Sequence, residues 1–496
     1  MTVRKTFHFS TVVWGPWHTG VFLDVNLTSL LAPENLAAFA QKHDVRYRIF
    51  TSKNDVARIE ATKAFQLASK IVRFELIGLN IDRSIDPIAM HHILWRRSID
   101  DARKAGAMIL LIPPDVVWSN GAFGHIADIA ALGKKAIFMT YMRVVSETAV
   151  PEVKRLFQDP ATSVVDAPSR PLVELCMRHL HPLALTYVRD CPNFPVHPEL
   201  VLWPVEGEGY LMRSLVREMF AYDPRHFDLN SQALLAHRPD PNDVHYITDS
   251  DNLFSLSLTP LMKDIEWFAK PGPLDPLRLG AWWLRYDSPA NDIVADHRFY
   301  VHTKGRTGAP WRRAELQSDI LIQRLMGARE VLRILSGLAK QGRADIEQIL
   351  ATALIEARLA RWCRRDGPIT ILLPHKSVTR RWVAEEAPHL AKKRGARRRL
   401  LRLILDHVLV GHLALEPGVE ASLPTPLGGW RKLTWKGQIP QIDGVPIATP
   451  GLVVGGVWCF PLETELPPSK TNSRCDPAGK RPHRELAVES TESLQM

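Results

Sequence analysis

Short apolar runs alternate with amphipathic stretches over the first 145 residues of the chain. The apolar runs predict strands, and apolar residues at helical spacing predict helices over 54–70 and 86–105. The predicted strands are Phe7–Val13, Tyr47–Thr51, Ile71–Leu76, Met108–Ile112 and Ala136–Tyr141. This alternation is typical of an α/β fold with a mostly parallel, helix-covered sheet.

The pattern changes twice further along the chain. From about 150 to 310 prolines, aromatic residues and histidines become frequent, and short runs at Leu200–Trp203 and Val244–Thr248 predict strands joined by long loops. After Trp311 apolar residues return to helical spacing, which predicts an appended helical region. A stretch rich in proline and glycine, from 415 to 460, predicts small strands, and the polar segment after it is expected to be disordered.

Composition fits a soluble globular protein, because 46% of the 496 residues are hydrophobic and 23% are charged. No apolar stretch reaches the roughly 18–20 residues that span a membrane, and the first apolar run is expected to be a strand, not a signal peptide. The five cysteines are odd in number and lack paired metal spacing, which argues against a disulfide framework or a zinc site. The expected location is the cytoplasm.

The net charge of +10 is concentrated in part between Arg380 and Arg402. Seven basic residues occur there without an acidic one between them: Lys392, Lys393, Arg394, Arg397, Arg398, Arg399 and Arg402. A solvated helix face is the simpler interpretation. Peripheral contact with an anionic membrane, at the inner membrane face, is the alternative that we carry forward, and no nucleic-acid partner is expected.

Polar joints follow the carboxyl ends of four predicted strands, where ligands bind in open α/β sheets. The joints are Trp14–Trp17, Thr51–Asn54, Asp115–Gly121 and Arg143–Glu147, and they would share one rim. Asp115 could hold Mg²⁺ or Mn²⁺ that neutralises a diphosphate, or it could cap the turn after Pro113-Pro114. The Trp14 indole could stack on a base, and Gly15 would let the backbone approach a ligand.

Further acidic residues gather in the loops between 200 and 300. Asp249 and Asp251 are two positions apart and could chelate a metal ion or simply favour a turn. Glu206 and Glu208 lie between glycines, in a loop that could present a base to an acceptor hydroxyl. The same loops also hold Asp287, Asp292, His297 and His302. Each histidine is either a metal ligand or a core histidine with satisfied hydrogen bonds.

Several familiar signatures are absent from the sequence. There is no GxGxxG after the first strand, no GxxxxGK[ST] and no GxSxG. Dinucleotide oxidoreductases, P-loop phosphotransferases and α/β-hydrolases thus lose their main sequence support, which favours nucleotide-sugar chemistry within the α/β class.

The motifs at 9–39, 47–60, 108–123 and 133–147 resemble those of bacterial GT-A-type glycosyltransferase-like proteins, the nucleotide-diphospho-sugar transferases. The resemblance spans roughly 7–310 and rests on the order of several short motifs. It implies a Rossmann-like nucleotide-binding sheet, a nucleotide-sugar donor and, in many members, a divalent cation. The usual Asp-x-Asp is absent at Asp115, which Val116 and Val117 follow, and the nearest such pair is Asp249-Ser250-Asp251.

The resemblance implies that the loop at Trp14 and the Thr51–Asp55 joint hold the nucleoside and that Asp115 stands at the metal. The full set of expected nucleotide-sugar contacts is Trp14, Gly15, Thr51, Asp55, Asp115, Ser119 and Asn120. Asp115 and His302 are the expected metal ligands, and Glu208, Asp249 and Asp251 are the expected catalytic residues. The implied organisation is a nucleotide-sugar-binding half (1–150), an acceptor or catalytic half (151–310), a helical basic region (311–412), a Pro/Gly-rich region (413–460) and a tail (461–496).

The leading hypothesis is a glycosyltransferase that moves a sugar from a nucleotide donor to an acceptor hydroxyl, for example in surface polysaccharide or glycoconjugate synthesis. Two alternatives stay open. One is a non-catalytic protein that keeps a degenerate transferase fold and docks on membrane or nucleic acid through 380–402. The other is a sugar-nucleotide hydrolase, in which water replaces the acceptor.

Overall fold

The chain divides into two compact units in the computed structural model, Met1–Leu332 and Arg333–Met496. The described residues are 4–81, 85–195, 198–216, 219–227, 240, 242–262, 272–274, 279–280, 282–283, 294–340, 369–375, 377–379, 381–382, 405–410, 413, 415–425, 429–449, 451–454 and 457–467. Within these ranges no helix is long and apolar enough to cross a bilayer.

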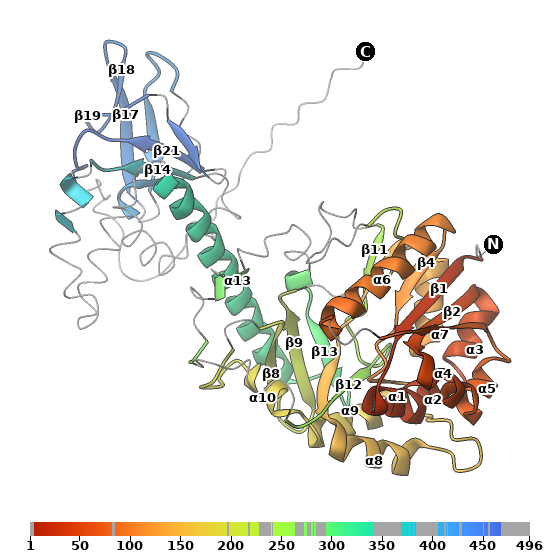
Figure 1. Cartoon of the computed structure of the whole chain (residues 1–496). Helices are drawn as coiled ribbons and strands as arrows, with labels where there is room; N and C mark the ends of the chain where they lie inside the picture. Colours follow the sequence, from red (N-terminus) through yellow and green to blue (C-terminus); the bar gives the residue numbers. More distant parts are fainter. Residues whose placement is uncertain are drawn as a thin grey trace, which may run out of the picture. The chain divides into compact units, whose positions relative to one another are not determined.

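The first unit is built on a seven-stranded sheet in the order β11-β6-β10-β4-β1-β2-β3 (Figure 1). Its strands are β1 (Thr6–Val12), β2 (Asp44–Ser52), β3 (Arg73–Leu79), β4 (Met108–Leu111), β6 (Ala136–Phe138), β10 (Met219–Tyr222) and β11 (Val244–Tyr246). β10 runs antiparallel to its neighbours β4 and β6, while every other pairing in the sheet is parallel. The predicted mostly parallel α/β sheet is confirmed.

Helices pack on both faces of this sheet. On one face α3 (Leu36–Lys42), α5 (Lys63–Ala68) and α7 (Ala122–Ala131) bury side chains against Phe7 and Phe9 of β1. On the other face α6 (Pro87–Lys104) packs Ile99 against Ile109 of β4. Because both faces are covered, β4 and β6 are apolar throughout, while β1 and β2 carry polar residues among their apolar ones.

Two predicted elements are shorter than the sequence pattern indicates. The helix expected over 54–70 is two helices, α4 (Lys53–Glu60) and α5, because Thr62 accepts a hydrogen bond from the backbone N–H of Phe65 and starts a new helix. The strand expected over Ala136–Tyr141 ends at Phe138, since the chain then leaves for a second sheet.

Two three-stranded sheets complete the first unit. One contains β5 (Val116–Trp118), β12 (Ser255–Thr259) and β7 (Met142–Val145), and the other contains β13 (Phe299–His302), β9 (Gly209–Ser214) and β8 (Leu200–Val205). The expected joint at 143–147 is therefore mostly strand β7 followed by the start of α8 (Ser146–Phe157). The expected joint after Asp115 likewise contains β5. Shorter helices of this unit are α1 (Pro16–Val21), a π-helix (Phe22–Asn26), α2 (Leu27–Leu30), α9 (Ser169–Arg178) and α10 (Pro182–Thr186).

Helix α13 (Ala309–Lys340) follows the last of these strands, where the sequence predicts helix. The helical region expected over 311–412 also contains two strands, Ile369–Leu373 and Val408–Val410, and its residues 341–368 lie outside the described part. The second unit holds one sheet of order β15-β14-β21-β20 and a meander of order β16-β17-β18-β19. Its strands are β14 (Ile369–Leu373), β15 (Val408–Val410), β16 (Ala421–Pro424), β17 (Trp430–Lys436), β18 (Ile439–Ile442), β19 (Val445–Pro446), β20 (Leu452–Val454) and β21 (Val457–Pro461). The small strands predicted between 415 and 460 are present, and Leu462 and Leu466 beyond them are buried. Residues from 468 onward lie outside the described part.

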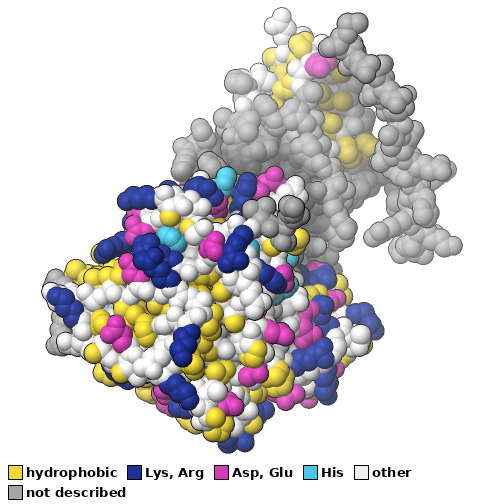
Figure 2. All heavy atoms as spheres, turned by 90° about the vertical axis from the view of Figure 1, so that its right-hand side faces the viewer, with side chains coloured by type: hydrophobic (Ala, Val, Ile, Leu, Met, Phe, Trp, Pro, Cys, Tyr) yellow, Lys and Arg dark blue, Asp and Glu magenta, His cyan; other side chains and the backbone are white. Residues whose placement is uncertain are grey.

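Charge is spread over the first unit on the face drawn in Figure 2. Lysine and arginine side chains occur there among acidic and apolar ones and do not form one continuous patch. Of the basic segment 380–402, only Arg381 and Trp382 are described, and Arg381 pairs with Glu465. The membrane contact expected of this segment stays a prediction.

Candidate functional site

The turn that carries Asp249 and Asp251 is held against strand β13. The backbone N–H of Tyr300 donates to the carbonyl of Thr248 at 2.8 Å, and that of Ser250 donates to the carbonyl of Tyr300 at 2.9 Å. The backbone N–H of His302 donates to the Ser250 hydroxyl at 3.1 Å. These bonds bring a turn just after β11 beside the end of β13, and the two acids beside His302.

Asp249, Asp251 and His302 form a three-residue group that could hold a metal ion, with one ligand atom from each within 4.8 Å of the others. The Nε2 atom of His302 lies 2.9 Å from a carboxylate oxygen of Asp249 and 3.9 Å from one of Asp251. Two carboxylates and an imidazole are a suitable donor set for a divalent cation and leave coordination positions for ligand oxygens. Asp115, the other residue expected to bind the metal besides His302, is not a member of this group.

The ring of His302 turns Nε2 toward the acids, so a bound cation would take the place of the proton that Nε2 now donates to Asp249. Its Nδ1 atom faces the carbonyl oxygen of Lys304, which can only accept a hydrogen bond, so Nδ1 carries a proton. A metal-binding histidine typically donates its other ring N–H in this way, which fixes the orientation of the ring. The indole of Trp311 packs edge-on to the imidazole, with 6.3 Å between the ring centroids.

Two arginines balance the acids of the group. Arg170 of α9 makes paired hydrogen bonds of 2.9 and 2.8 Å to Asp251, and Arg306 lies 2.8 Å from Asp249. Burial alone would raise the pKa of Asp249, but the hydrogen bonds from His302 and the backbone of Asp251, with the charge of Arg306, hold it below its ordinary value. The hydrogen bond from Arg170 does the same for the pKa of Asp251. Both carboxylates are therefore ionised at neutral pH, as metal ligands must be.

Glu208 lies next to this group, in the turn of the β8–β9 hairpin. Its carbonyl accepts from the backbone N–H of Thr303, the residue after His302, at 2.9 Å. Its carboxylate accepts from the indole N–H of the buried Trp311 at 2.6 Å. The structure thus places the three expected catalytic residues, Glu208, Asp249 and Asp251, around the end of β13. Their catalytic role stays a prediction. Glu206 of the same turn is exposed.

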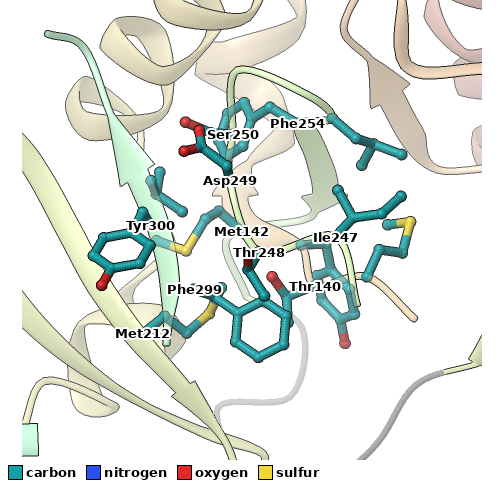
Figure 3. A pocket seen from close by; sticks show the side chains of 14 residues that line it. Thr140, Met142, Met212, Ile247, Thr248, Asp249, Ser250, Phe254, Phe299 and Tyr300 are labelled. Atoms are coloured by element: carbon teal, nitrogen blue, oxygen red, sulfur yellow. The ribbon is translucent and has the colours of Figure 1, made fainter. Parts of the chain in front are cut away.

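A small space with a volume of about 10 Å³ lies beside the turn. Figure 3 shows Asp249 and Ser250 at one end of it and Met212 and Phe299 at the other. A space of this size holds about one water molecule. It is too small for a sugar or a nucleotide.

The nucleoside side of the expected site lies at the carboxyl ends of β1 and β2. Gly15, with φ of +85°, precedes α1, and its backbone N–H donates to Asp55 at 3.4 Å. Ser52 also donates to Asp55, at 2.6 Å. The structure therefore brings the Trp14-Gly15 and Thr51–Asp55 joints together, and Trp14 itself is half-buried against Phe50 and Leu94.

Two threonines at this end of the sheet have hydroxyls without a hydrogen-bond partner. They are Thr51 at the end of β2 and Thr19 of α1, and both residues are fully buried. Buried hydroxyls are ordinarily hydrogen-bonded, so these two need an explanation such as water or a bound ligand. Nothing in the sequence marks Thr19 as a candidate site residue, because threonines are common in helices.

The remaining expected contacts are engaged within the protein. Ser119 exchanges hydrogen bonds with the backbone of Phe254, and its carbonyl accepts from Asn35. The Asn120 side chain accepts from the backbone N–H of Glu34 at 2.9 Å. The Asp115 carbonyl accepts from the backbone N–H of Leu258 at 2.8 Å, which joins β5 to β12. These residues hold neighbouring segments together, and their contact with a nucleotide-sugar stays a prediction.

Arg170, Arg306 and Trp311 are the members of the site that the sequence analysis does not single out. Arg170 is 81 positions from Asp251, so no local pattern connects the two residues. Arg306 and Trp311 lie just beyond His302, in the segment where the resemblance ends.

No protein-family model matches the chain, and no curated protein matches it. Among solved structures, a Bacillus anthracis protein provisionally named a glucose-1-phosphate thymidylyltransferase, in complex with sucrose, is similar to part of the chain. The match has 12% identity and a TM-score of 0.17, and it covers 29% of this chain and 57% of that one. At such a TM-score it carries no argument about fold or activity.

Proposed function

We propose that the protein is a glycosyltransferase that uses a nucleoside-diphosphate sugar and a divalent cation. The observation that carries the proposal is the convergence of Asp249, Asp251 and His302 at the rim of a mostly parallel α/β sheet. Ligands of such sheets bind beyond the carboxyl ends of the strands.

The topology sets a distance that suits such a donor. Strands β1, β4, β6 and β11 all point the same way, so their carboxyl ends share one edge. β1 and β11 are four strand spacings apart, or about 19 Å at about 4.8 Å each. An extended nucleotide-sugar can span from the joints at Gly15 and Asp55 to Asp249, and Asp115 after β4 lies between them.

In this proposal the residues of the group and its neighbours have separate chemical roles. Asp249, Asp251 and His302 would hold the cation, which supplies Lewis-acid stabilisation of the leaving diphosphate when bound. Arg170 and Arg306, released from the acids by the cation, would bind diphosphate oxygens. The acceptor hydroxyl forms its bond to the anomeric carbon as the bond to the diphosphate breaks, and its proton passes to a carboxylate base. Glu208 is the predicted base.

Manganese titration tests the metal site directly. Wild-type protein should bind Mn²⁺, because the three ligand atoms are preassembled. A nucleoside diphosphate added with Mn²⁺, at about 100 times the dissociation constant of the ligand, should raise the free energy of unfolding by about 2–3 kcal/mol. Asp249→Asn should weaken Mn²⁺ binding at least about tenfold, the usual scale for the loss of a ligand or its support. Calorimetric titration and thermal unfolding measure the two effects.

The matched control is Asp128→Asn, which removes an exposed aspartate paired with Lys42 outside the site. It should leave Mn²⁺ affinity unchanged. If wild-type protein bound no Mn²⁺, or if Asp249→Asn bound it as tightly as wild type, the group would be a structural ion network tied by Arg170 and Arg306. Release of nucleoside diphosphate from a panel of nucleotide-sugars then tests transfer itself.

A further inference from the structure

A cavity of about 430 Å³ opens beside strand β13 and the first turns of α13. Its lining includes Thr248, His297, Arg298, Tyr300, Asp319 and Gln323. The volume falls in the range of small-molecule sites, roughly 300–1,000 Å³. Helix α13 lies almost wholly beyond the part of the chain that carries the resemblance, and of the candidate residues named from the sequence His297 lines this cavity.

The cavity adjoins the Asp249–Asp251–His302 group through two segments of chain. Thr248 precedes Asp249, and the backbones of Thr248 and Tyr300 are hydrogen-bonded. Tyr300 and His302 are two positions apart on β13 and share one face of the strand. Both rings pack against the indole of Trp311, with ring centroids 5.9 Å from it for Tyr300 and 6.3 Å for His302. A ligand in the cavity would thus lie next to the proposed cation.

The cationic groups of the cavity are already neutralised. Arg298 makes hydrogen bonds of 3.2 and 2.5 Å to the two carboxylate oxygens of Asp319 and lies 3.7 Å from the carboxylate of Glu315, so two acids face the two arginines. Arg213, which is almost fully buried, also bonds to Asp319 and donates to the carbonyls of Ala295 and Asp296 at 2.9 and 2.8 Å. An anionic ligand would have to compete with Asp319 for these donors, and breaking a buried pair is costly.

We propose that this cavity is the acceptor subsite and that it takes a neutral saccharide. The role of acceptor rests on the proposed glycosyl transfer. The binding of a saccharide in this cavity does not depend on it. The amide of Gln323, the hydroxyl of Thr248 and the ring of His297 offer both donors and acceptors, as sugar hydroxyls require. The ion pair of Asp319 and Arg298 adds polar atoms to the wall of the cavity, and its two charges cancel.

The test measures saccharide binding without metal or nucleotide, so that its failure and the failure of the donor site can be told apart. Saturation-transfer NMR on the full chain compares neutral disaccharides (maltose, cellobiose and lactose) with glucuronic acid and glucose 6-phosphate. Gln323→Trp should fill the cavity, because Gln323 is exposed at its wall. The expected result is binding of a neutral disaccharide by wild type and at least a tenfold loss in Gln323→Trp.

Arg324→Trp is the matched control, since Arg324 is the next residue of α13, is exposed and does not line the cavity. It should bind as wild type does. Gln323→Ala, which keeps the helix and cannot overpack, covers the case in which the tryptophan variant fails to fold, and it should also weaken binding. Three results would overturn the proposal: no binding of a neutral saccharide by wild type at millimolar concentration, a preference for the charged sugars, or binding by both Gln323 variants as tight as that of wild type.

Discussion

At the residue scale, Gly209 controls how closely β9 approaches β13. Its φ is +142°, and a Cβ built on it would lie 2.0 Å from the carbonyl oxygen of Val301. Gly209 is also the residue paired with His302 across the two strands. Gly209→Ala must therefore push β13 away and move His302, with an expected loss of about 3 kcal/mol or more in unfolding free energy and of Mn²⁺ binding. Chemical denaturation and Mn²⁺ titration measure the two losses.

Gly207 in the same hairpin is the control for backbone conformation alone. Its φ is +68°, and nothing lies within 4 Å of a Cβ at that position. Gly207→Ala should cost about 1 kcal/mol, the usual penalty for a left-handed residue, and leave Mn²⁺ binding intact. Equal effects of the two substitutions would mean that the close approach at Val301 does not position His302.

Individual site residues could be predicted from the sequence only where local chemistry marks them. Asp249 and Asp251 are visible as acids two positions apart, and His302 as a histidine in the same loop-rich segment. That these three residues meet depends on the pairing of the 248–250 turn with β13, over about fifty positions of chain. Register between segments so distant leaves no periodic trace in either one.

At the element scale, two helix caps separate stability from ligand binding. Ser52 caps α4 and Thr62 caps α5, with hydroxyl oxygens that accept from backbone N–H groups at 3.2 and 3.3 Å. Ser52 also donates to Asp55, the carboxylate that reaches the backbone of Gly15. Replacing either capping residue with alanine should lower the free energy of unfolding by about 1 kcal/mol.

Only Ser52→Ala should also weaken nucleoside diphosphate binding, because it frees the Asp55 side chain that links the two joints. Thermal unfolding with and without a nucleoside diphosphate and Mn²⁺ compares Ser52→Ala with Thr62→Ala. A ligand shift reduced to the same extent in both variants would show that general loss of stability, and not the Asp55 contact, is responsible.

The strands of the main sheet could be predicted from the sequence, whereas one insertion could not. β4 is a continuous apolar run because helices cover both faces of the sheet, whereas β1, β2 and β3 mix polar residues with the apolar ones that mark them as strands. β10 has only four residues and no alternating pattern, yet it lies antiparallel between β4 and β6. Its place is set by packing of Phe220 and Tyr222 into cores on the two faces of the sheet, which local propensity does not encode.

At the scale of the whole molecule, the hydrophobic cores divide the chain as the two compact units do. The described clusters of the first unit extend no further than Met326 of α13, and the cluster of the second unit runs from Leu372 to Leu466. The sequence predicts the change of texture near Trp311, but not that the first turns of α13 complete the core that contains Trp203 and Trp283. The apolar spacing of a helix does not say which strands it covers.

A fragment of residues 1–340 should therefore fold alone, since it keeps α13 to its end and every described core of the first unit. We expect cooperative unfolding and Mn²⁺ affinity within about threefold of the full chain, less than the tenfold that corresponds to 1.4 kcal/mol. A fragment of residues 1–308 is the matched control. It lacks the buried Trp311, Leu321 and Leu325, so its remaining core is exposed to water and it should unfold without cooperativity. If 1–340 behaved like 1–308, the second unit would be needed to stabilise the first, and the division of the chain into independent units would be wrong.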